Sequence, residues 1–443
     1  MRAVVFLLIF LMGLGLIFVS PFYGVLLWYA FSFGNFHTVT WGALGDLYLA
    51  YVIVVLTGIS WMLSSTEKKR LPLTPLVVLT LLFSLWMTIT SCFALAPAEV
   101  VWDRWVFVHK VLLMGLVGYA LTTTRERVNQ LVWVVVLSIG FWGVKGALSF
   151  ILHGGGGTVG IHGPEAGVTA GNNEFGIALV MILPLLFYQW HLAVNPHLRR
   201  GLMVMGFLVS LAVIFTYSRG ALLALCGMGA LLWLRSRAKF ATGVLILAVG
   251  FFVYSFVPQH WFDRMATIET YESDGSARDR IDFWNISLRI AEVHPIMGGG
   301  FWVTYSPDIT NAMLVGTTLR RLTIPRAAHS IWLETLSEHG WVGLALFVMI
   351  GGYSWLSCSS LVRHARGRPD LAWANLLGRM GQGALVGFWT GGSFNSMAYF
   401  DEYWCIIFIL DAARRVVAKE VVEPARSLAT IPALLGRPLG NNF

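Results

Sequence analysis

The chain has 443 residues, of which 57% are hydrophobic and only 12% are charged, and its mean hydropathy is +0.70. These values exclude an ordinary soluble domain. The formal charge of +8 does not indicate nucleic-acid binding, because most basic residues fall in short loops between apolar runs, a pattern typical of the cytoplasmic loops of membrane proteins.

Apolar runs long enough to cross about 30 Å of hydrocarbon recur along nearly the whole chain. Backbone polar groups in lipid must be satisfied within helices, so the sequence predicts an all-α, polytopic membrane helical bundle. With the basic loops taken as cytoplasmic, we expect about twelve crossings and both termini in the cytoplasm. The crossings are expected at 1–33, 44–63, 72–95, 100–121, 128–152, 174–194, 201–218, 220–234, 241–257, 330–357, 371–391 and 401–413.

These crossings divide the chain into four parts. Residues 1–257 form the first set of transmembrane helices, 258–328 a large outer loop, 329–413 the C-terminal helices and 414–443 a cytoplasmic tail. The first apolar stretch resembles a signal peptide, but a second apolar run follows Pro21 directly, so we interpret it as a retained helix. Pro21 is expected to split 1–33 into two helices that count as one crossing.

Two outer segments are long enough to build a site. The Gly-rich loop 153–173 lacks the Gly-Lys-Ser/Thr ending of a phosphate loop, so we expect it to cover a site rather than bind a nucleotide. In the long loop, Ile281, Trp284, Leu288 and Ala291 recur at helical spacing. They predict an amphipathic helix that lies along the outer membrane surface and ends at His294-Pro295.

The stretch from Ile324 to Ile350 carries ionisable residues at the mouth of a membrane helix, where they are costly unless they pair or perform chemistry. Ser330 is a good N-cap residue, so the helix is expected to begin just after His329. An imidazole there could accept a proton from a hydroxyl group. The alternative is a structural histidine.

Several arginines are candidates for holding an anion. Arg219 lies at the outer end of a tight helical hairpin, where it either grips a phosphate or extends to the membrane surface. Arg280 and Arg326 flank the amphipathic helix, with surface ion pairs as the alternative role. Arg104 and Lys110 enter the membrane on one helix, and buried pairing with Glu174 or Asp401 is the alternative for such intramembrane charges.

No pattern of metal ligands is evident. The four cysteines lie within or beside apolar runs without CxxC spacing, and neither an HExxH motif nor an obvious carboxylate pair occurs. The sequence therefore predicts chemistry without a metal or other cofactor.

Three strings in this order resemble the bacterial O-antigen ligase and polymerase superfamily. They are TYSRG at 216–220, RIDFW with HPIMGGGF at 280–284 and 294–301, and AAHSIWLETLSEHGWVGL at 327–344. The resemblance covers roughly residues 170–405, and the N-terminal third is similar to that of O-glycosylation ligases. It implies a fold like that of type C membrane glycosyltransferases.

The resemblance also implies a reaction. In this superfamily a glycan on undecaprenyl diphosphate is transferred, with inversion and without metal, to a sugar hydroxyl, commonly of the lipid A core. The reaction site then faces the periplasm from the inner membrane, and the partners are the lipid-linked glycan, lipopolysaccharide and the bilayer.

Roles carry over by position. His329 matches the family's histidine, Arg219 the arginine of its Ser-Arg-Gly, and Arg280 its loop arginine; where the family often has Asn after the histidine, this chain has Ser330. Glu338, His339 and Lys110 are secondary candidates. On an ideal helix Glu338 points nearly opposite His329, so we do not expect the two to pair directly.

The sequence leaves the acceptor open. A polymerase of the same superfamily and a protein O-glycosylation ligase are the alternatives. A transporter of lipid-linked glycans that uses Lys110, Lys145 and Arg379 along a pathway is a more remote alternative, because no internal repeat is evident.

Overall fold

The computed structural model describes residues 2–36, 49–153, 160–165, 167–236, 238–240, 243–244, 275–314 and 326–429. Within these ranges the chain forms helices and no strands, which confirms the all-α prediction. The helices are α1 (Arg2–Val19), α2 (Pro21–Gly34), α3 (Leu49–Leu63), α4 (Pro75–Cys92), α5 (Ala98–Leu121), α6 (Arg125–Leu152), α7 (Asn172–Leu192), α8 (Pro196–Phe215), α9 (Arg219–Leu234), α12 (Gly275–Val293), η2 (Val303–Tyr305), α13 (Pro307–Met313), α14 (Ile331–His364), η3 (Pro369–Leu371), α15 (Ala372–Gly392) and α16 (Asp401–Ala429).

The helices follow the predicted crossings closely. Ser20 is extended and Pro21 opens α2, so the first apolar stretch is split as expected. Among the described residues, α4, α6, α7, α8 and α14 are long and apolar enough to cross a membrane. The predicted crossing at 241–257 lies almost entirely outside the described residues, and α16 continues past the predicted crossing to Ala429. The number twelve and the orientation of the chain stay predictions.

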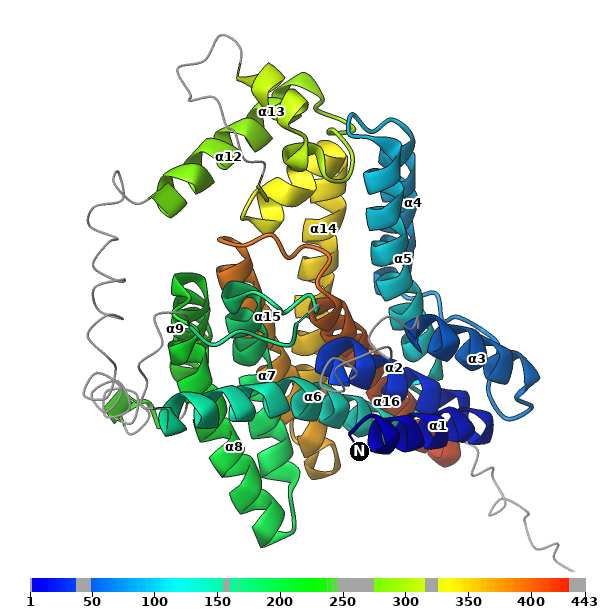
Figure 1. The fold of residues 1–443 in the computed structure, drawn as a ribbon. Coiled ribbons are helices and arrows are strands. Elements are labelled where there is room, and N and C mark those ends of the chain that lie inside the picture. The colour runs from blue at the N-terminus through cyan, green and yellow to red at the C-terminus, as the bar shows by residue number, and fades with distance from the viewer. Residues whose placement is uncertain are drawn as a thin grey trace, which may run out of the picture.

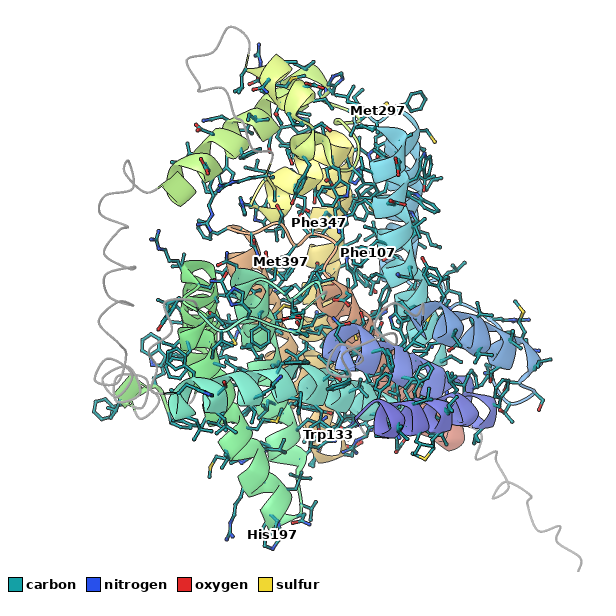
Figure 2. All side chains as sticks on the ribbon, viewed as in Figure 1. Phe107, Trp133, His197, Met297, Phe347 and Met397 are labelled. Carbon is teal, nitrogen blue, oxygen red and sulfur yellow. The ribbon has the colours of Figure 1, made fainter. Side chains whose placement is uncertain are left out.

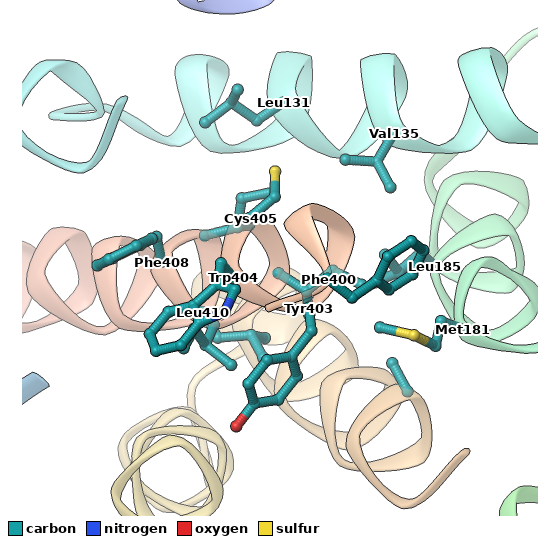
Figure 3. Packing of buried hydrophobic residues seen from close by; sticks show 14 of the residues in the cluster. Leu131, Val135, Met181, Leu185, Phe400, Tyr403, Trp404, Cys405, Phe408 and Leu410 are labelled. Carbon is teal, nitrogen blue, oxygen red and sulfur yellow. The ribbon is translucent and has the colours of Figure 1, made fainter. Parts of the chain in front are cut away.

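The helices cross at steep angles around α15 and α16. In Figure 1, α4 and α14 run from top to bottom while α1 and α6 run across the view. The central helix α15 packs against α7, α9, α14 and α16. Figure 3 shows Tyr403, Trp404 and Phe408 of α16 packed below Leu131 and Val135 of α6. All five side chains are almost wholly buried, so the apolar run 403–410 of α16 lies in the core of the bundle.

The long helix α14 is kinked at Gly340, which has φ 65° and ψ −170°. A kink leaves backbone groups without helical partners, and here the loop after α12 satisfies them. The Trp341 N–H donates to the Pro295 carbonyl at 2.9 Å, while the Gly299 and Gly300 N–H groups donate at 2.8 Å to the carbonyls of residues 337 and 338. The HPIMGGGF string therefore locks α12 to the first turns of α14.

The helix α12 is apolar on two opposite faces rather than one. Phe283, Ile286 and Ile290 pack with Val303 and Leu314 in a small separate core. Of the residues predicted to form the apolar face, Ala291 is buried, but Ile281 and Leu288 are 42% and 44% exposed. The predicted helix is confirmed, and the structure adds a second apolar face, which α13 and η2 cover. The location of the helix along the membrane surface stays a prediction.

Candidate functional site

His329 lies immediately before α14, as predicted. Its backbone is left-handed (φ 49°), an uncommon conformation for a residue other than glycine. The His329 N–H donates to Ser396 Oγ at 2.8 Å, which holds this conformation. Ser330 occupies the predicted N-cap position, but its side chain makes no capping hydrogen bond. The imidazole is therefore positioned by the segment between α15 and α16 as well as by its own helix.

The surroundings of His329 favour the uncharged imidazole. Burial and the positive charge of Arg280 lower the pKa of His329 to about 4, and Arg326 lowers it further. A hydrogen bond with Asn395 and the charge of Asp279 act in the opposite direction. Near neutral pH the ring is therefore neutral and able to accept a proton.

Arg326 forms an ion pair with Asp279 of α12, with 2.7 Å between Nη1 and Oδ2. The two side chains are 42% and 32% exposed. The surface ion pair considered as the alternative role of this arginine is thus present. It also ties the segment before His329 to the start of α12.

Arg219 is the first residue of α9 and lies in a turn that is fixed from several sides. Ser218 caps α9, with its Oγ accepting from the Ala221 N–H at 3.1 Å and donating to Asn173 Oδ1 at 2.7 Å. The Ile161 N–H of the Gly-rich loop donates to the Phe215 carbonyl at 2.9 Å. The described end of this loop therefore packs against the hairpin that carries Arg219.

The connection between α15 and α16, residues 393–400, joins the elements that carry the predicted residues. The ring centres of Phe394 and of Trp284 in α12 lie 6.3 Å apart. Asn395 Nδ2 donates to Glu174 Oε1 of α7 at 2.9 Å, next to the Asn173 that binds Ser218. Because Asn395 also contacts His329, the hairpin of Arg219 and the turn of His329 are linked through α7.

The same connection binds two buried carboxyl groups in the first turns of α14. The Ala398 N–H donates to Glu334 Oε2 at 2.9 Å, and the Tyr399 hydroxyl donates to Glu338 Oε2 at 2.7 Å. Glu338 Oε1 accepts from the Trp302 N–H at 3.0 Å. Glu338 therefore pairs with these donors and not with His329, as the helical geometry predicted.

Arg104 of α5 lies beside this carboxyl pair. Its guanidinium group is 5.4 Å from the Trp302 ring centre and 5.5 Å from that of Tyr399. Burial raises the pKa of Tyr305, the charge of Glu334 raises it further, and the charge of Arg104 lowers it. Arg104 is thus close to acids and aromatic rings in a cluster about one and a half to two and a half turns along α14 from His329.

Two of the secondary candidates lie away from His329. Lys110 lies 5.0 Å from the ring centre of Tyr51 and 5.8 Å from that of Phe107. His339 is fully buried, with Nδ1 2.7 Å from Thr90 Oγ1 and its ring edge against Phe301. Glu174 and Asp401, considered as partners of intramembrane charges, instead accept hydrogen bonds from Asn395 and Ser32.

Sequence reasoning missed Asn395, Ser396 and Tyr399. Their contacts join positions 61 or more residues apart in the chain, such as Tyr399 and Glu338. The only available signal was the polar interruption GGSFNS at 391–396 between two apolar runs. Arg320 and Arg321, which follow the amphipathic helix in the sequence as further candidates for holding an anion, lie outside the described residues.

Two family models match parts of the chain. Residues 204–348 match the family described as O-antigen ligase, and residues 1–194 match a family of unknown function. No curated protein matches the chain. The matched range contains Arg219, Arg280 and His329, and members of this family are glycosyltransferase-like ligases. The match over residues 204–348 therefore supports the resemblance to the O-antigen ligase superfamily.

Proposed function

We propose that the protein is an O-antigen ligase that transfers a glycan from undecaprenyl diphosphate to a sugar hydroxyl of the lipid A core. The reaction takes place on the periplasmic side of the inner membrane and needs no metal. The observation that carries the proposal is a neutral His329 at a helix start, with a pKa lowered to about 4 by burial and by Arg280.

In the proposed reaction His329 accepts the proton of the acceptor hydroxyl. The hydroxyl oxygen attacks the anomeric carbon of the glycan, and the bond from that carbon to the diphosphate oxygen breaks. The products are the glycosylated acceptor, with inverted configuration, and undecaprenyl diphosphate. Arg280 and Arg219 stabilise the negative charge that develops on the departing diphosphate.

A base with a pKa of about 4 is weak. In the proposed reaction, binding of the donor raises this pKa. The diphosphate brings negative charge next to Arg280 and offsets the positive field that lowers the pKa of His329. Binding of the donor therefore raises the basicity of the imidazole at the stage when the acceptor hydroxyl must lose its proton.

The test is a transfer assay with the purified protein, an undecaprenyl-diphosphate glycan and lipopolysaccharide that lacks O-antigen. We expect a glycan-shifted lipopolysaccharide band that survives EDTA. His329→Ala should lower the rate by about 10²–10⁴-fold. The matched control is His197→Ala, which changes an exposed histidine at the start of α8, at the lower end of the molecule in Figure 2. Transfer by His329→Ala at the wild-type rate would remove the proposed base.

The same assay separates the alternatives. Longer carrier-linked chains without modified lipopolysaccharide would make the protein a polymerase. Transfer to a protein acceptor would make it a protein O-glycosylation ligase. Movement of the lipid-linked glycan across vesicles without any transfer product would favour a transporter.

A further inference from the structure

A cavity lined mainly by polar residues lies at the opposite end of α14 from His329. Its volume is about 370 Å³, and α9, α14 and α15 contribute to it. The residues that line it are Arg235, Ser359, Val362, Arg363, Arg379 and Gln382. It shares no residue with the site proposed for glycan transfer.

Three of these residues are arginines, and the lining contains no acid. Elsewhere in the described chain, Arg127, Arg289, Arg326, Arg368 and Arg414 each form an ion pair with a carboxylate. In the same part of the chain no carboxylate is paired with Arg235, Arg363 or Arg379. Three guanidinium groups around one cavity repel one another, and an anion between them relieves that repulsion.

The polar lining of the cavity is fixed by hydrogen bonds. Arg235 donates to the side-chain oxygen of Gln382 and lies 5.2 Å from the ring centre of Trp355. Gln382 Nε2 donates to Ser359 Oγ at 2.9 Å, and Gln382 is almost fully buried. One guanidinium group is thus held in place while Arg363 and Arg379 supply further donors, an arrangement suited to an anion with several oxygens.

Two exposed apolar residues lie close in the sequence to residues that line the cavity. Leu234 precedes Arg235 and is 59% exposed, and Leu356 lies one turn before Ser359 in α14 and is 58% exposed. An exposed apolar surface beside clustered arginines is the pattern expected at a membrane interface, where the polar headgroup of a lipid meets its acyl chains.

We propose that the cavity between α9, α14 and α15 binds a phosphate group, presented in the membrane by the headgroup of an anionic phospholipid. The guanidinium groups of Arg235, Arg363 and Arg379 contact the phosphate oxygens. The acyl chains lie against the apolar surface of α9 and α14. This proposal does not depend on the proposed glycan transfer.

The test is native mass spectrometry of the full chain in detergent, titrated separately with phosphatidylglycerol, phosphatidylcholine and inorganic phosphate. We expect phosphatidylglycerol to bind more tightly than phosphatidylcholine. The Arg363→Gln/Arg379→Gln variant should weaken phosphatidylglycerol binding by at least about tenfold, because each lost hydrogen bond to a charged group is worth about that factor. Arg366→Gln, an exposed arginine just after the end of α14 that does not line the cavity, is the matched control.

The single variant Arg363→Gln guards against misfolding, because this side chain is exposed, and it should show part of the same loss. Binding of inorganic phosphate that the double variant loses, without any preference for phosphatidylglycerol, would keep the anion site and overturn the lipid as its occupant. Equal binding of every probe by the wild type and the double variant would overturn the proposal.

Discussion

At the scale of single residues, the lowered pKa of His329 makes the pH dependence of the reaction predictable. The ordinary pKa of 6.5 falls to about 4, so the free enzyme keeps an unprotonated base down to that pH. The acid limb of kcat/KM, which reports the free enzyme, is therefore expected near pH 4. The acid limb of kcat is expected at higher pH, because the bound diphosphate raises the pKa of His329.

Arg280→Gln tests the electrostatic cause directly. Removing this positive charge raises the pKa of His329, so the acid limb of kcat/KM should move to higher pH. Arg289→Gln is the control, because Arg289 lies on the same helix in an exposed pair with Glu292. Coincident limbs for the wild type and Arg280→Gln would contradict the assignment.

The variant Arg219→Lys tests whether a positive charge alone at this position is enough to stabilise the departing diphosphate. Lysine keeps the positive charge but loses the planar, bidentate fork that matches a phosphate. Arg219→Lys should therefore lower kcat/KM at least about tenfold, the loss expected for one hydrogen bond to a charged group, without changing the thermal unfolding midpoint. Arg200→Lys, an exposed arginine at the opposite end of α8 from that hairpin, should leave both unchanged. A fully active Arg219→Lys would leave the arginine with no role beyond its charge.

At the scale of elements, the kink in α14 gives a prediction about stability. Gly340 has backbone angles that are nearly restricted to glycine, and a Cβ there would lie 2.1 Å from the Ile296 carbonyl oxygen. Gly340→Ala should cost at least about 1–3 kcal/mol and lower the unfolding midpoint in detergent. Gly352→Ala is the control, since a Cβ at that position of the same helix meets nothing within 4 Å. Equal midpoints would mean that the loop after α12 is not locked into the kink.

The same element marks the limit of prediction from the sequence. The apolar run at 330–357 and Ser330 were enough to predict the start of the helix. The kink was not predictable, because it depends on Gly299 and Gly300 donating to carbonyls about 38 positions away in the chain. In α12, local periodicity gave the helix but not its buried face, because the residues that cover Phe283 and Ile290 come from η2, α13 and Leu314.

At the scale of the whole molecule, the predicted orientation places α13 and the start of α8 on opposite sides of the membrane. Figure 2 shows His197 and Met297 at opposite ends of the structure. In a background without the four native cysteines, Asp308→Cys should react with an impermeant maleimide in cells whose outer membrane is permeabilised. His197→Cys should react only after lysis. The reverse pattern would invert the topology and move His329 to the cytoplasm.

The connection at 393–400 has a consequence for what counts as a minimal catalytic unit. The O-antigen ligase match ends at residue 348, yet Ser396 holds the backbone of His329, and Glu174, before the match, binds Asn395. An excised 204–348 fragment would therefore keep its signature residues and lose their alignment. Modular exchange between relatives would need to transplant residues on both sides of that boundary together.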